Sequence, residues 1–77
     1  MDNLVVVDTG DEYRFEPEDA DNGVFRIMTF GQRVARVVYG QGGGYHVMPD
    51  GLAIDRATLD DIAEIFGHRL RKRGVLR

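Results

Sequence analysis

Only the last quarter of this 77-residue chain has the periodicity of an α-helix, and the residues before it form short β-type segments separated by turns. Apolar residues recur there at three- and four-residue spacing, at Leu59, Ile62, Ala63, Phe66 and Leu70. A helix with one apolar face buries that face against a sheet. The chain is therefore predicted to be a single α+β domain over residues 1–77, an antiparallel β-meander of about four to five strands with one C-terminal helix packed on one face.

The ends of the helix are predicted from its capping residues. Thr58-x-x-Asp61 matches a capping box, so the helix is expected to begin at Thr58. Basic residues near its end complement the helix dipole, and Gly74 is the expected C′ residue. Gly67 lies inside the helix, where glycine costs up to about 1 kcal/mol relative to alanine. We therefore expect Gly67 to mark a close approach to the sheet.

The strand pattern is found in segments 4–7, 12–16, 24–30, 33–39 and 45–48. In the second segment, Tyr13 and Phe15 alternate with charged residues, which predicts a half-buried strand with a charged outer face. Pro17 is expected to end that strand, and residues 18–23 are expected to form a loop that closes with the turn pair Asn22-Gly23.

The third and fourth segments are predicted to form a hairpin with a type II′ turn at Gly31-Gln32, because glycine suits the first position of that turn. In this register Met28 faces Ala35. One face of the hairpin then carries Phe25, Ile27, Thr29, Val34, Arg36 and Val38. Both faces of the hairpin are substantially apolar.

Composition argues against several chemistries. The chain has no cysteine and no serine, which excludes disulfides, thiolate metal sites and the commonest nucleophiles. His46 and His68 have no second histidine at metal-ligand spacing. The longest aliphatic run is residues 4–7, far below the roughly 20 residues of a membrane span. We expect a non-enzymatic protein without cofactor or metal, located in the cytoplasm.

Two loops resemble ligand-binding loops but lack the residues that bind. If Gly23 is aligned with the invariant glycine of an EF-hand, Ala20 and Thr29 fall on ligand positions, and Thr29 replaces the bidentate glutamate. The glycine run at residues 40–44 leads into a strand instead of a helix and lacks the Walker lysine. Neither a calcium site nor a nucleotide site is predicted.

Charge is strongly polarised along the chain. Residues 1–22 hold eight acids and one base, whereas residues 68–77 hold five bases and no acid. The acidic region predicts a partner-binding surface made of Asp8, Asp11, Glu12, Glu16, Glu18, Asp19 and Asp21. Apolar anchors for a partner could come from Tyr13, Phe15, Tyr39 and Tyr45, although a domain this small needs most of its aromatic residues in the core.

The size, the acidity and the β-rich build with one helix resemble the anti-CRISPR proteins that phages encode, particularly those acting on type I systems. The likeness covers the whole chain and is one of class, so it assigns no individual residue. It implies a stoichiometric inhibitor in the host bacterial cell. Such an inhibitor places carboxylates in a basic groove of a CRISPR effector subunit and blocks binding of target DNA.

Two other functions fit the sequence. A small nucleic-acid-binding protein would use Arg26, Arg33, Arg36 and the basic C-terminal segment from Arg69 to Arg77 to contact phosphates. A scaffold protein would use the spare apolar sheet face to pair copies of itself. The expected oligomeric state is a monomer or a weak homodimer.

Overall fold

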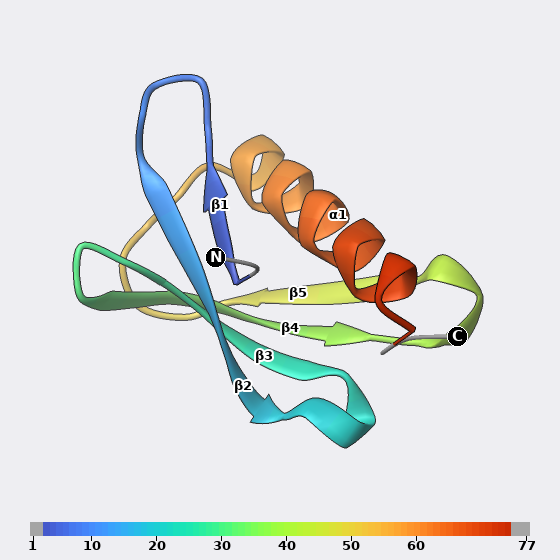
Figure 1. The fold of residues 1–77 in the computed structure, drawn as a ribbon. Coiled ribbons are helices and arrows are strands. Elements are labelled where there is room, and N and C mark those ends of the chain that lie inside the picture. Colours follow the sequence, from blue (N-terminus) through green and yellow to red (C-terminus); the bar gives the residue numbers. More distant parts are fainter. Residues whose placement is uncertain (1–2, 75–77) are drawn as a thin grey trace.

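The computed structural model describes residues 3–74, which form one antiparallel sheet and one long helix (Figure 1). The sheet has the strand order β1-β2-β3-β4-β5. Its strands are β1 (Leu4–Val6), β2 (Glu12–Asp19), β3 (Val24–Thr29), β4 (Gln32–Tyr39) and β5 (Tyr45–Pro49). The helix α1 (Arg56–Lys72) packs on one face, and the short 3₁₀ turns η1 (Ala20–Asn22) and η2 (Gln41–Gly43) precede β3 and β5. The predicted α+β meander with a C-terminal helix is confirmed.

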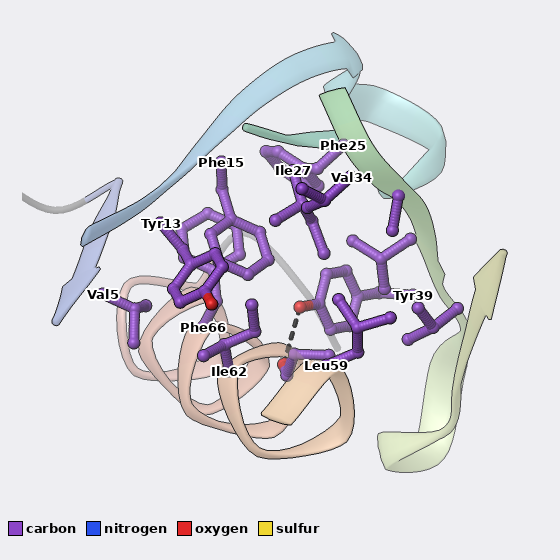
Figure 2. Packing of buried hydrophobic residues seen from close by; sticks show 14 of the residues in the cluster. Val5, Tyr13, Phe15, Phe25, Ile27, Val34, Tyr39, Leu59, Ile62 and Phe66 are labelled. Atoms are coloured by element: carbon purple, nitrogen blue, oxygen red, sulfur yellow. Dashed lines mark hydrogen bonds between the residues drawn. The ribbon is translucent and has the colours of Figure 1, made fainter. Parts of the chain in front are cut away.

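The core lies between α1 and the sheet, which curves around the helix (Figure 2). The Phe66 ring is fully buried, stacks on Phe15 at a centroid distance of 4.2 Å and meets Phe25 edge-on at 5.0 Å. The predicted helical stripe is confirmed, because all of its members are buried: Leu59, Ile62, Ala63, Phe66 and Leu70. Phe66 therefore joins the helix to two strands at once.

Strand β2 is longer than the sequence pattern predicts. Pro17 does not end it, because Pro17 still pairs with Phe25 and the strand runs on to Asp19 through a bulge at Glu18. The amide of Phe15 points toward β1, where it donates to the carbonyl of Asn3. Backbone direction alternates along a strand, so the nitrogen of Pro17 points to the same side, beyond the end of β1, where no N–H is needed.

The turn between β3 and β4 lies one residue earlier than predicted. Its central residues are Phe30 and Gly31, both with positive φ (51° and 72°), and not Gly31-Gln32. Met28 consequently pairs with Arg33, and a bulge at Val34 places Ile27, and not Met28, opposite Ala35. The β4 residues that share the helix-covered face with Phe25, Ile27 and Thr29 are Ala35, Val37 and Tyr39, with Val34 also buried in the bulge. The predicted face assignment for β4 was wrong because a one-residue slip moves every side chain to the other face.

Helix α1 begins earlier than predicted. Asp55 is the N-cap, and its carboxylate accepts hydrogen bonds from the amide and the hydroxyl of Thr58, at 3.1 and 2.8 Å. Thr58 is thus the third helical residue and not the cap. The residue before the cap, Ile54, packs against the core that contains Leu59, as in a hydrophobic staple, which favours the earlier start. At the other end, Gly74 has a positive φ of 76° and follows the C-cap, as predicted.

The cap makes a pH-dependent contribution to stability. The hydrogen bonds from Thr58 hold the pKa of the Asp55 carboxyl below its ordinary value of 3.8. A carboxyl whose pKa falls on folding stabilises the fold above its unfolded pKa, and this stabilisation is lost as the pH falls through the folded pKa. We expect the difference in Tm between wild type and Asp55→Ala to be largest at neutral pH and to shrink below pH 3.8. Asp55→Asn keeps an acceptor that does not titrate, so its Tm difference from Asp55→Ala should stay constant. If the Tm of wild type and the Tm of Asp55→Ala changed in parallel across this pH range, Asp55 would not be the pH-dependent cap.

Candidate functional site

The seven carboxylates of the predicted surface lie in or beside β2, three near each end and one between them. Asp8 and Asp11 belong to the loop between β1 and β2, and Glu12 begins β2. At the other end of β2 lie Glu18, Asp19 and Asp21, with Glu16 between the two groups on the uncovered sheet face. The eight residues of β2 separate its ends by roughly 20 Å at the rise of a strand. The sequence cluster is therefore not one cluster in space.

Arginines from the uncovered face neutralise one member of the second group. Glu18 accepts two hydrogen bonds from Arg36, at 2.8 and 3.2 Å, and its carboxylate lies 3.8 Å from the Nε of Arg26. Arg26 and Arg36 are direct cross-strand neighbours, so Glu18 also relieves a like-charge pair. Asp19 accepts a hydrogen bond from Asn22 within the turn. Local contacts thus account for Glu18 and Asp19.

The first group of acids gains two carboxylates from the start of α1. A hollow lies between the β1–β2 loop and this helix end, and we call it the acidic hollow. Its carboxylates are Asp8, Asp11, Asp55 and Asp61. No cationic side chain is among the described residues that line it, and its apolar part comes from Val7, Tyr13, Ala53 and Ile54. Burial, followed by the charges of Asp11 and Asp55, raises the pKa of the Tyr13 hydroxyl.

Among residues 3–74, Phe30 is the most exposed large apolar side chain, with 75% of its surface accessible. It occupies the first central position of the β3–β4 turn, with a φ of 51°. Turns with positive φ at both central residues favour Asn, Asp or Gly there, because a bulky side chain is strained in this conformation. Within residues 3–74, Phe30 is also the one non-glycine residue with positive φ.

A second hollow, which we call the sheet hollow, lies beside Phe30 on the face that α1 leaves uncovered. Its apolar side chains are Leu4, Met28 and Phe30. Its charged side chains are Asp11, Glu12 and Glu16 against Arg14. Asp11 lines both this hollow and the acidic hollow. We call the two hollows together the acidic end of the molecule.

The aromatic residues considered as anchors from the sequence belong to the core. Tyr13, Phe15 and Tyr39 are buried, and Tyr45 is half-buried against the core, with its hydroxyl donating to the carbonyl of Asp60. The exposed aromatic residue is instead Phe30. The sequence held one signal for it, because a turn at Phe30-Gly31 also satisfies the strand pattern and leaves the ring at the tip.

The arginines of the nucleic-acid alternative are not brought together. Arg26 and Arg36 lie on the uncovered sheet face, where both meet Glu18, and Arg33 pairs with Asp50 at 3.0 Å. The basic residues from Arg69 to Arg73 lie at the end of α1, in the other layer of the fold. Arg77 lies outside the described residues. The two basic sets therefore lie in different layers of the fold.

Among residues 3–74, no group of three or more His, Asp or Glu residues is arranged to hold a metal ion. In the same range, no helix combines the length and the apolar character that crossing a membrane requires. Comparison with known protein families, curated protein sequences and solved structures finds no match to this chain.

Proposed function

We propose that this protein is a non-enzymatic inhibitor that binds another protein through its acidic end, with Phe30 as the apolar anchor. The partner is a protein with a basic nucleic-acid-binding groove. In the form that the anti-CRISPR resemblance suggests, the partner is a subunit of a type I CRISPR effector, and binding blocks access of target DNA. The exposed and strained Phe30 is the observation that carries the proposal.

The backbone conformation of Phe30 costs free energy that its exposed ring does not recover in the isolated fold. A non-glycine residue in the left-handed region costs about 1–2 kcal/mol. A ring with 75% of its surface accessible recovers little of that free energy by burial. Residues that break a local rule without a structural gain are found at functional sites, and aromatic side chains are common binding hot spots. A partner that buries the ring supplies the missing stabilisation.

The surroundings of Phe30 determine what kind of partner fits. Beside it lie Asp11, Glu12 and Glu16, and farther along the same end lie the other three carboxylates of the acidic hollow, Asp8, Asp55 and Asp61. This surface attracts a positively charged one and accelerates its approach, and salt screens the attraction. Grooves that hold nucleic acid carry arginine and lysine for phosphate contacts. Carboxylates fixed at one end of the sheet can pair with the same arginine and lysine side chains, whereas Phe30 supplies affinity that salt does not remove.

Replacing Phe30 tests the strain without any partner. We expect Phe30→Asn to raise the free energy of unfolding by about 1 kcal/mol, because asparagine tolerates positive φ far better. For a domain of this size the corresponding rise in Tm is roughly 4–8 °C. Thermal unfolding followed by circular dichroism measures it. A lower Tm would show that the ring stabilises the fold, and the argument for an anchor would fail.

The binding experiment compares two pairs of charge changes of equal size. Asp11→Asn with Glu12→Gln neutralises two carboxylates at the acidic end, and Asp19→Asn with Asp21→Asn neutralises two at the opposite end of β2. Titration against purified type I CRISPR effector complexes gives the affinity of each variant. We expect the first pair to weaken binding and to reduce its salt dependence, and the second pair to bind like wild type. Phe30→Asn should weaken binding by about thirtyfold, the size of a hot-spot loss of 2 kcal/mol.

Three outcomes would overturn the proposal. The first is no binding to any effector complex, and the second is equal weakening by both charge pairs, which would indicate net charge instead of a site. In the third, gel shifts show that the protein itself binds DNA with an affinity that falls steeply as salt rises, which would favour the nucleic-acid alternative.

A further inference from the structure

Strand β1 lies beside one flank of α1 (Figure 1). A groove with an apolar centre runs between them. Val6 on the strand and Ile65 on the helix both line it, with 55% and 44% of their surfaces accessible. Ile65 stands beside the buried stripe of α1, so its side chain contributes to the flank and not to the core. This groove is separate from Phe30, which lines the sheet hollow.

β1 presents backbone groups along this groove. The amide of Val7 donates to the carbonyl of Asp11, and the carbonyl of Asn3 accepts from Phe15, so odd-numbered residues of this segment pair with β2. Backbone direction alternates along a strand, which turns the N–H and C=O groups of Leu4 and Val6 to the outer edge of the sheet. The guanidinium of Arg69 donates to the carbonyl of Leu4. The amide and carbonyl of Val6 therefore face outward at the centre of the groove.

Charge changes sign along the groove. Its carboxylates, Asp8, Asp61 and Glu64, lie toward the start of α1, and its cationic side chains, Arg69 and Arg71, lie toward the helix end. Ile65 separates the two sets on the helix. When such a surface meets a copy of itself across a twofold axis, the acidic half of each copy faces the basic half of the other. Antiparallel pairing of two β1 strands has this symmetry.

We propose that this groove is a homodimer interface, in which the β1 strands of two copies pair antiparallel about Val6 and extend the sheet across both. The two Val6 residues exchange N–H to C=O hydrogen bonds, because these groups face outward. Leu4 of one copy then lies opposite Asp8 of the other, which brings that carboxylate toward the Arg69 that caps the Leu4 carbonyl. Pairing also covers Val6 and Ile65 and removes an open sheet edge rich in valine. The dimer does not depend on the proposed function.

The mass in solution tests the dimer. Light scattering after size exclusion and sedimentation equilibrium are expected to give twice the chain mass of 8.7 kDa at high concentration, with dissociation on dilution. Val6→Pro removes an outward N–H and leaves the pairing with β2 in place, because proline is tolerated at such edge positions. Ile65→Lys leaves the strand untouched and places a charge at the apolar centre. Each variant should raise the dissociation constant by about tenfold or more, whereas Phe30→Asn should leave it unchanged.

Each result supports or overturns the interface. The interface is supported if wild type and Phe30→Asn are dimers and Val6→Pro and Ile65→Lys are monomers. All four proteins must have native circular dichroism. A wild-type monomer at every concentration would overturn it, and so would a dimer that persists in folded Ile65→Lys. The result for Ile65→Lys is decisive whether or not Val6→Pro folds. Partner binding lost in Phe30→Asn but kept in Ile65→Lys would separate this inference from the proposed function.

Discussion

Replacing Phe66 by alanine is expected to lower the free energy of unfolding by about 3–5 kcal/mol. The ring is fully buried, stacks on Phe15 and meets Phe25 edge-on, so truncation removes packing and leaves a cavity between α1 and the sheet (Figure 2). A domain of this length has a total stability of roughly 4–12 kcal/mol. Phe66→Ala should therefore remove a large share of that stability, and chemical denaturation followed by circular dichroism measures it.

Phe66→Leu is the matched control. Leucine keeps an apolar side chain at the same place and fills much of the volume, so a cost of less than about 2 kcal/mol is expected. If the alanine and leucine variants lost the same stability, the ring contacts would not be what joins α1 to the sheet. If Phe66→Ala lost less than about 1 kcal/mol, the packing would differ from the structure described.

The parts of the fold that sequence predicted correctly are those set by local periodicity. The stripe from Leu59 to Leu70 identifies the buried helix face without knowledge of the sheet, because each member repeats at helical spacing. The position of the β3–β4 turn depends on strand pairing and burial as well as on local sequence preference. A turn at Phe30-Gly31 places an aromatic residue at positive φ, which local preference disfavours. Pairing along the strands and burial of Ala35, Val37 and Tyr39 outweigh that preference.

The candidate site was only half accessible from sequence, because its two sides come from different connections. In an antiparallel meander, alternate connections lie at the same end of the sheet, so the loop with Asp8 and Asp11 and the turn with Phe30 are neighbours. The chain returns to this end before α1, which adds Asp55. Once the meander topology is assumed, it predicts that these connections lie together at one end of the sheet. Proximity along the chain instead grouped Asp11 with Asp19, which β2 holds apart.

Replacing Gly67 by alanine is expected to destabilise the protein by about 1–2 kcal/mol, although alanine is the better helix former. Helix preference favours alanine by up to about 1 kcal/mol. A β-carbon at this position would lie 2.7 Å from Cε1 and 3.2 Å from Cδ1 of Tyr39. That ring is held in place, because it is buried and its hydroxyl donates to the carbonyl of Ala63 at 2.6 Å. Overpacking a fixed neighbour costs about 1–3 kcal/mol, so the clash outweighs the preference.

Making Gly67→Ala in a Tyr39→Leu background separates the clash with the Tyr39 ring from any other effect of the alanine. In Tyr39→Leu, the ring edge that meets residue 67 is absent, so adding Gly67→Ala should cost nothing or give the stabilisation that helix preference predicts. The double-mutant cycle measures the difference as a coupling free energy between the two positions, which direct contact requires to be well above zero. Additive changes in the free energy of unfolding would show that Gly67 is not there to admit the Tyr39 ring. A coupled result would confirm that this glycine sets the distance between α1 and β4, and with it the closeness with which the helix covers the core.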